Sequence, residues 1–265
     1  MLTQALDYLD ECTVLDDLLR ETDGSLWEQP TQFKGWTFND VVGHLYLFDD
    51  AAKLTLEDPE AFAGFIEEKR RLIADGRSLQ EYTRAWHGER RGHELLSRWR
   101  ESFREVSRVY AAADPRRRVA WAGPAMSVRS CISARQMETW AHGQALFDAL
   151  GRARVEHDRI KNIVIMGINT FAWTFTNRGL DVPGAKPAVR LTAPSGAIWE
   201  WNEHCADSRV EGTAVDFCRV VTQTRHVSDT DLRVTGETAT QWMAQAQCFA
   251  GPPEPPPAPG TRFAR

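Results

Sequence analysis

The chain has 265 residues, of which 42% are hydrophobic and 26% charged, and its formal net charge is −5. This composition is typical of a globular protein of one or two domains, and the acidic balance argues against nucleic acid as a partner. No apolar run approaches the roughly 18 residues of a membrane span, and the N-terminus lacks the basic start of a secretory signal. Five cysteines at long spacings, without a CxxC pair, predict reduced thiols and a cytoplasmic location.

The first part of the chain, residues 1–183, predicts a succession of helices. Apolar residues recur there every three to four positions, as on the buried face of a helix. Thr37, with Asp40 three residues later, has the pattern of a capping box that begins a helix. The expected helices cover residues 3–21, 38–56, 59–75, 78–113, 127–150 and 158–177. They predict a helical bundle.

The pattern changes after Gly179, where Pro183 and Pro187 mark a boundary. Short alternating segments predict strands, and two apolar-periodic segments between and after them predict helices. The expected strands cover residues 189–193, 197–203 and 231–235, and the expected helices cover residues 213–224 and 238–249. We therefore expect a small α+β domain over residues 184–250, then an extended or disordered proline-rich tail over residues 251–265. The expected fold class is α+β.

Three side chains on two of the expected helices are candidate metal ligands. His44 lies on the apolar face of its helix, so it points inward, and Glu138 and His142 are four residues apart on one helix face. Two imidazoles and a carboxylate suit zinc, and three protein ligands leave one coordination position open. The alternative is a core histidine at position 44 and an ion pair of Glu138 with His142 or Arg135.

Other chemically reactive residues carry weaker signals. His87 and His93 are six residues apart, on different faces of the expected helix, so we expect both on the solvated surface. Trp199 and Trp201 alternate along an expected strand and therefore share a face. That pair belongs to the core of the small domain or lines a site for an apolar ligand.

Two segments resemble a known family. Residues 36–45, WTFNDVVGHL, are similar to the WTxxDVxxHL signature of the DinB-like helical-bundle superfamily, and residues 135–146, RQMETWAHGQAL, resemble a later helix of its mycothiol-dependent maleylpyruvate isomerase branch. In that branch the signature histidine and the later E-x-x-x-H bind a metal, which implies His44, Glu138 and His142 as ligands. The region after Pro183 resembles the branch's C-terminal domain, which is similar to sterol-carrier proteins.

The resemblance implies a four-helix bundle with extra helices and a metal-dependent enzyme. Zinc is the first candidate for the metal, with nickel, iron and manganese as alternatives. The cofactor would be mycothiol or another low-molecular-weight thiol. In the family's founding chemistry the thiol adds to a double bond of a conjugated diacid, rotation follows, and the thiol leaves. We expect isomerisation or S-transfer to a small electrophile, by a monomer or a homodimer.

The same chemistry needs a cationic side chain that orients the substrate carboxylates. Arg135 lies one helical turn before Glu138 and is one candidate. Arg225 is the other, although Thr224-Arg225 stands where the family usually has Gly-Arg. Two other functions remain open: a non-catalytic, metal-containing protein that binds an apolar ligand, and a hydrolase that uses metal-bound hydroxide.

Overall fold

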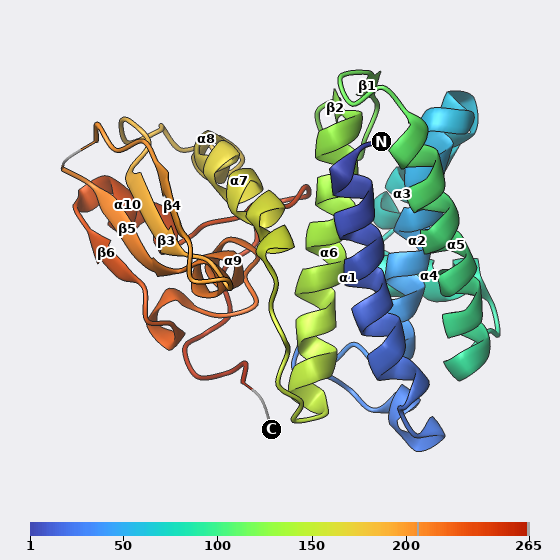
Figure 1. Cartoon of the computed structure of the whole chain (residues 1–265). Helices are drawn as coiled ribbons and strands as arrows, with labels where there is room; N and C mark the ends of the chain where they lie inside the picture. Colours follow the sequence, from blue (N-terminus) through green and yellow to red (C-terminus); the bar gives the residue numbers. More distant parts are fainter. Residues whose placement is uncertain (206, 264–265) are drawn as a thin grey trace. The chain divides into compact units, whose positions relative to one another are not determined.

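The computed structural model describes residues 1–205 and 207–263. Contacts divide the chain into two compact units, residues 1–146 and residues 147–265. The first unit is helical and the second contains a four-stranded sheet with helices, which confirms the α+β fold class (Figure 1). Among the described helices, none combines the length and apolarity that crossing a bilayer requires.

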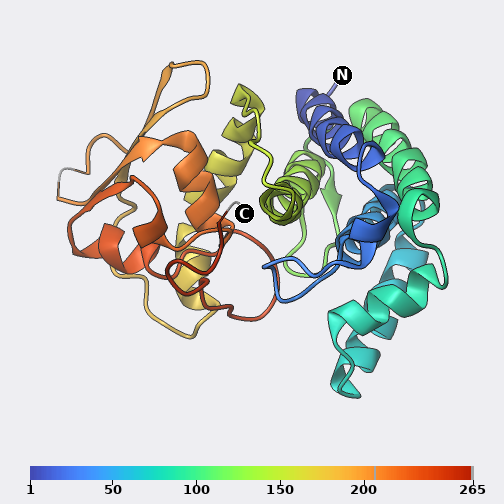
Figure 2. The same cartoon turned by 90° about the horizontal axis from the view of Figure 1, so that it is seen from below.

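The first unit is a bundle of four long helices with two shorter ones beside α2. Helices α1, α2, α5 and α6 run side by side, and α3 and α4 pack against α2 (Figures 1 and 2). Two-residue strands β1 and β2 pair antiparallel between α5 and α6. The bounds are α1 Thr3–Arg20, α2 Phe38–Glu57, α3 Pro59–Ala74, α4 Leu79–His87, α5 Gly92–Ala112, β1 Arg118–Val119, β2 Met126–Ser127 and α6 Val128–Ala149. A short 3-10 helix, Gly24–Glu28, precedes α2.

The predicted capping box at the start of α2 is confirmed. The Asp40 backbone N–H donates to Thr37 Oγ1 over 3.2 Å, and the Thr37 N–H donates to Asp40 Oδ2 over 2.9 Å. These bonds satisfy donors that the first turn of a helix leaves without partners. They fix where α2 begins, and so fix the position of His44 two turns later.

The single helix expected over residues 78–113 is wrong, because the chain forms α4 and α5 there. Gly88 ends α4 with a φ of 64°, in the left-handed region that glycine adopts without steric cost. The side chain of Asn39 on α2 then accepts a hydrogen bond of 2.8 Å from the Gly92 backbone N–H, at the start of α5. The break folds α4 back against α2.

The second unit contains a sheet with strand order β4-β3-β5-β6. Strand β3 pairs antiparallel with β4 and parallel with β5, and β5 pairs antiparallel with β6. The bounds are α7 Lys161–Asn169, α8 Phe171–Thr176, β3 Ala188–Thr192, β4 Ile198–Trp201, β5 Arg209–Thr213, α9 Ala214–Val221, β6 Arg233–Thr235 and α10 Glu237–Met243, with 3-10 turns at Asp158–Ile160 and Val227–Asp229. Helix α9 packs on β3 and β5 and also against α7.

Aromatic residues fill the core of this second unit. The ring of Trp242 on α10 meets Phe171 and Phe217 edge-on, with centroids 5.3 and 5.7 Å apart. Gly167 permits a close approach of α7 and α9, because a Cβ there would lie 2.9 Å from Val221. Tight packing of this kind fixes the helices against one another.

Two elements of the second unit differ from expectation. Strand β5 was not predicted, and the helix expected over residues 158–177 is divided at Thr170 into α7 and α8. The contacts also group residues 147–183 with the second unit, so a domain boundary at residue 183 stays a prediction. Residues 251–263 form no helix or strand, and the Glu254 carbonyl accepts bonds from Arg178 and Gln223.

Candidate metal centre

His44, Glu138 and His142 converge between α2 and α6. Their ligand atoms lie within 4.8 Å of one another, the one such group of His, Cys, Asp or Glu side chains in the described chain. Glu138 Oε2 lies 3.4 Å from His44 Nε2 and 3.2 Å from His142 Nε2. A tetrahedral zinc site with bonds of about 2.0–2.1 Å has ligand atoms about 3.3–3.4 Å apart. The donor set and its spacing therefore fit a divalent metal.

The protonation states of His44 and Glu138 also suit a metal. Burial, and then the neighbouring charge of His142, lowers the pKa of His44 to about 4, so this imidazole is neutral at pH 7. Burial raises the pKa of Glu138, but hydrogen bonds from His142 and His44 outweigh burial and hold it well below its ordinary value. A neutral imidazole and an ionised carboxylate are the forms that bind metals.

Aromatic side chains surround the two imidazoles. Trp36 stacks parallel on His142 at 5.6 Å and meets His44 edge-on at 5.2 Å. Phe33 packs edge-on against His142 at 4.9 Å, and Phe48 contacts His44 at 4.8 Å. No described residue hydrogen bonds to His44 Nδ1. Ring packing, rather than a hydrogen bond to the second nitrogen, therefore fixes the orientation of His44.

Arg135 is buried in the bundle core, with 1% of its side chain exposed. Its Nε donates to Asp49 Oδ1 over 2.8 Å and its Nη2 donates to the Leu45 carbonyl over 3.2 Å. Trp99 Nε1 donates to the other Asp49 oxygen, also over 2.8 Å. Burial opposes the charge of Arg135, but Asp49 outweighs burial and the pKa of the guanidinium is raised. The ion-pair partner of Arg135 is thus Asp49 and not Glu138.

Arg225 lies in the second unit, in the turn after α9. Its Nη2 donates to Asp148 Oδ1 over 2.7 Å and its Nη1 donates to the Thr224 carbonyl over 2.8 Å. The side chain is 10% exposed. Its role toward a substrate stays a prediction.

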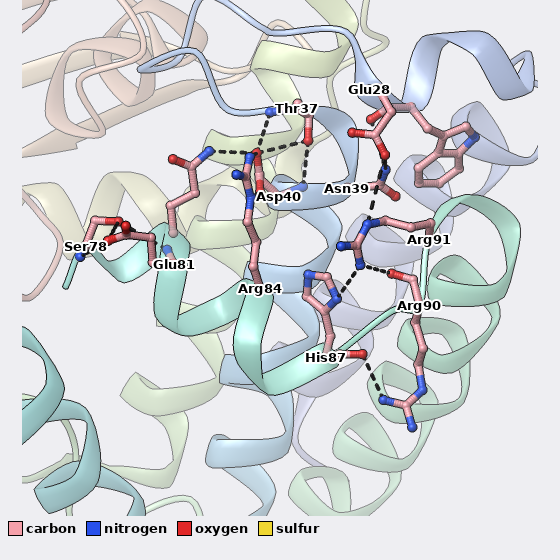
Figure 3. Close-up of polar contacts among 12 residues, drawn as sticks. Glu28, Thr37, Asn39, Asp40, Ser78, Glu81, Arg84, His87, Arg90 and Arg91 are labelled. Carbon is pink, nitrogen blue, oxygen red and sulfur yellow. Dashed lines mark hydrogen bonds and ion pairs between the residues drawn. The ribbon is translucent and has the colours of Figure 1, made fainter.

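Asp40 ties the helix that carries His44 to α4 (Figure 3). Its two oxygens accept bonds from Arg84 Nε at 2.6 Å and Nη2 at 2.8 Å, and Gln80 Nε2 donates over 2.7 Å. Burial raises the pKa of Asp40, but these bonds and the Thr37 cap lower it below its ordinary value. The capping box was visible in the sequence. The link to Arg84 was not, because it joins residues far apart along the chain.

The expectation of a surface position is wrong for His87 and confirmed for His93. His87 is 1% exposed at the end of α4, and its Nδ1 lies 3.3 Å from the Arg91 guanidinium (Figure 3). It packs on Gly43 of α2, where an added Cβ would lie 2.7 Å from the His87 ring. Burial lowers the pKa of His87, and Arg91 lowers it further. His93 is exposed, beside Trp27.

The family model of the mycothiol maleylpyruvate isomerase N-terminal domain matches residues 8–147. The chain belongs to this family. All three candidate ligands lie within the segment that matches the family domain. Both helices that carry them begin within this segment.

Relatives and solved structures extend the likeness to most of the chain. The uncharacterized proteins MT0041 and Rv0036c of two Mycobacterium tuberculosis strains, CDC 1551 and H37Rv, are each 37% identical over 247 residues, which is 93% of this chain and 95% of the relative. Two crystal structures of the mycothiol-dependent maleylpyruvate isomerase, one of them a mutant, superpose with TM-scores of 0.54 and 0.55 at 13% and 12% identity. The match covers 82% of this chain and 87% of each solved chain. At this identity the likeness shows a shared fold.

Proposed function

We propose that the chain is a metal-dependent enzyme that uses a low-molecular-weight thiol, mycothiol. The enzyme would either isomerise a small electrophile or join the thiol to it through sulfur. The observation that carries the proposal is the convergence of His44, Glu138 and His142 within 4.8 Å. Three protein ligands leave a position for an exogenous ligand, as catalytic zinc sites do. Membership of the mycothiol maleylpyruvate isomerase family supports the choice of thiol.

The three side chains would hold zinc, with nickel, iron and manganese as alternatives. Their mixed nitrogen and oxygen donors favour zinc, and both distances from Glu138 to the imidazoles are close to those of a tetrahedral site. Bound there, a divalent metal lowers the pKa of a coordinated thiol and supplies a thiolate near neutral pH. Because histidine binds metals as the neutral imidazole and Glu138 is the one carboxylate among the three ligands, the ligand set would neutralise one of the two charges of a divalent metal and leave one to attract an anion.

The aromatic shell would keep water away from this nucleophile. Trp36, Phe33 and Phe48 pack on the imidazole rings within 5.6 Å between ring centroids. Apolar walls strengthen charge interactions inside a site and exclude competing water.

Arg135 is proposed as a positioning residue, since its guanidinium binds the Leu45 carbonyl next to His44 and so joins α6 to α2. Arg225 is proposed to orient a substrate carboxylate, which requires exchange of its bond to Asp148.

Cobalt substitution tests the proposal. Addition of mycothiol to the cobalt-loaded protein should change the visible absorption of the metal, and zinc-loaded protein with mycothiol should isomerise maleylpyruvate. His142→Ala should lose both effects, whereas His157→Ala, an exposed histidine outside the centre, should retain them. A cobalt spectrum that does not change on addition of thiol would overturn the proposal. Hydrolytic activity would then favour the hydrolase, and absence of turnover would favour the binding protein.

A further inference from the structure

Lys69 on α3 is a half-buried cation without an acidic partner. Its Nζ lies 5.5 Å from the centroid of the Phe48 ring, and no ion pair joins it to a carboxylate in the described part of the chain. Burial lowers the pKa of Lys69, and the charge of Arg70 lowers it further. A cation–π contact offsets only part of the cost of removing an ammonium from water. An anion bound at this position would offset the remaining cost.

Phe48 connects this ammonium to the metal centre. The same ring contacts His44, with centroids 4.8 Å apart. The Lys69 side chain and a candidate metal ligand thus contact one shared aromatic ring. All three residues belong to the first unit, so this arrangement does not depend on the second unit.

Further aromatic side chains pack on the Phe48 ring that Lys69 contacts. Phe65 and Trp121 are both half-buried, with ring centroids 6.1 and 6.5 Å from Phe48. Phe62 stacks on Trp121 at 6.0 Å and fixes its orientation. Aromatic faces bind planar conjugated groups well, and they supply no charge that could neutralise the ammonium.

A second cation at the Phe48 ring is already neutralised. Arg135 also approaches the Phe48 ring, at 5.9 Å, but Asp49 holds its guanidinium in the core. We propose that Lys69 binds a carboxylate group of the substrate, a small unsaturated acid, beside the metal centre. This inference rests on the proposed function, and it assigns one positioning cation of that site to α3.

Binding of maleate, a small unsaturated diacid, tests the assignment by calorimetry. We expect Lys69→Met to raise the Kd of maleate about tenfold or more, because a charge-assisted hydrogen bond contributes at least about 1.4 kcal/mol. Arg70→Met is the matched control, since Arg70 is the next residue, carries the same charge and is 69% exposed. It should change the Kd less than about twofold, and Lys69→Arg should restore most of the affinity. The uncharged maleamide should bind wild type and Lys69→Met alike.

Equal effects of Lys69→Met and Arg70→Met, or no binding of maleate by wild type, would overturn the assignment. The zinc content of the same samples separates this result from failure of the proposed function. Wild type that binds zinc and thiol but shows no Lys69 effect contradicts only the role of Lys69. Wild type that binds no zinc contradicts the proposed metal centre. In that case the change in the Kd of maleate caused by Lys69→Met is measured on the zinc-free protein.

Discussion

Asp49 and Arg135 form a fully buried ion pair that lies close to the candidate metal ligands. Both side chains are at most 1% exposed, and Asp49 also accepts a bond from Trp99. Removal of one partner from such a pair leaves an uncompensated charge in the core. Arg135 also donates a hydrogen bond to the carbonyl of Leu45, the residue after His44. The pair therefore stabilises α2 next to a candidate metal ligand.

Asp49→Asn should lower the free energy of unfolding by about 3–5 kcal/mol, because the guanidinium of Arg135 would stay buried without a counter-charge. Urea denaturation at pH 7, followed by tryptophan fluorescence, measures this loss. Glu101→Gln is the control, since it removes an ion pair with Arg98 in which both side chains are more than half exposed. The control should cost less than about 1 kcal/mol. A loss for Asp49→Asn no larger than the control would contradict a structural role for the pair.

The three metal ligands could be predicted from the sequence because each signal was local. His44 follows a recognisable helix start, and Glu138 and His142 occupy one helix face. The partner of Arg135 could not be predicted, since Asp49 lies on another helix. Lys69 lies within the charged run EEKRR, where no local pattern distinguishes it from its solvated neighbours.

Helices α2 and α4 approach each other closely at Gly43 and His87. A Cβ at position 43 would lie 2.7 Å from the His87 ring, and His87 is too buried to move aside freely. Asp40 and Arg84 join the same two helices one turn earlier. The position of α4 therefore depends on the small residue Gly43 and on the ion pair that joins Asp40 of α2 to Arg84 of α4.

Gly43→Ala should destabilise the protein by about 1–3 kcal/mol, despite the higher helix propensity of alanine, because the added methyl overpacks the α2–α4 contact. Gly64→Ala on α3 is the matched control, since nothing lies within 4 Å of a Cβ there. That change should stabilise by about 0.5–1 kcal/mol. Thermal unfolding of both variants measures these changes in stability. An equal rise in Tm for both would show that α2 and α4 are not in close contact at Gly43.

Asp40→Asn should cost about 1–2 kcal/mol at pH 7 through loss of the capping and Arg84 bonds. The pKa of Asp40 is lowered in the folded protein, so its contribution is complete above the unfolded value of about 3.9. It is lost as the pH falls from there through the lower folded value. Urea midpoints of both proteins from pH 7 to pH 3 measure the difference, which should shrink below about pH 4. A constant difference over this range would contradict the lowered pKa.

The bounds of α1, α2, α3 and α6 agree with the predicted helices to within one residue, whereas α9 and α10 end earlier than predicted, at Val221 and Met243. The break between α4 and α5 and strand β5 were not predicted. The break between α4 and α5 was missed because helical periodicity continues across Gly88, whose positive φ ends α4. Strand β5 was missed because only Val210 in it is buried, and the partly buried Glu211 pairs with Arg233 on β6. Its place in the sheet comes from strands distant in sequence.

At the scale of the whole molecule, a bound metal would make the free energy of unfolding depend on the concentration of free metal ion in the buffer. A ligand that binds only the folded state stabilises by about 2.7 kcal/mol at a hundred times its Kd, which corresponds to a rise in Tm of several degrees. Zinc should therefore raise the Tm of wild type in a scan, and a chelator should reverse the rise. His142→Ala should show no such shift, whereas an equal shift in this variant would place the zinc elsewhere.

The most direct measurement is the metal content of purified protein by mass spectrometry, for wild type, His44→Ala, His142→Ala and the control His157→Ala. The account predicts about one divalent ion per chain in wild type and in His157→Ala, and almost none in the other two. Wild type that neither retains a metal nor takes up zinc or cobalt would contradict the central claim. So would His44→Ala and His142→Ala proteins that both keep their metal.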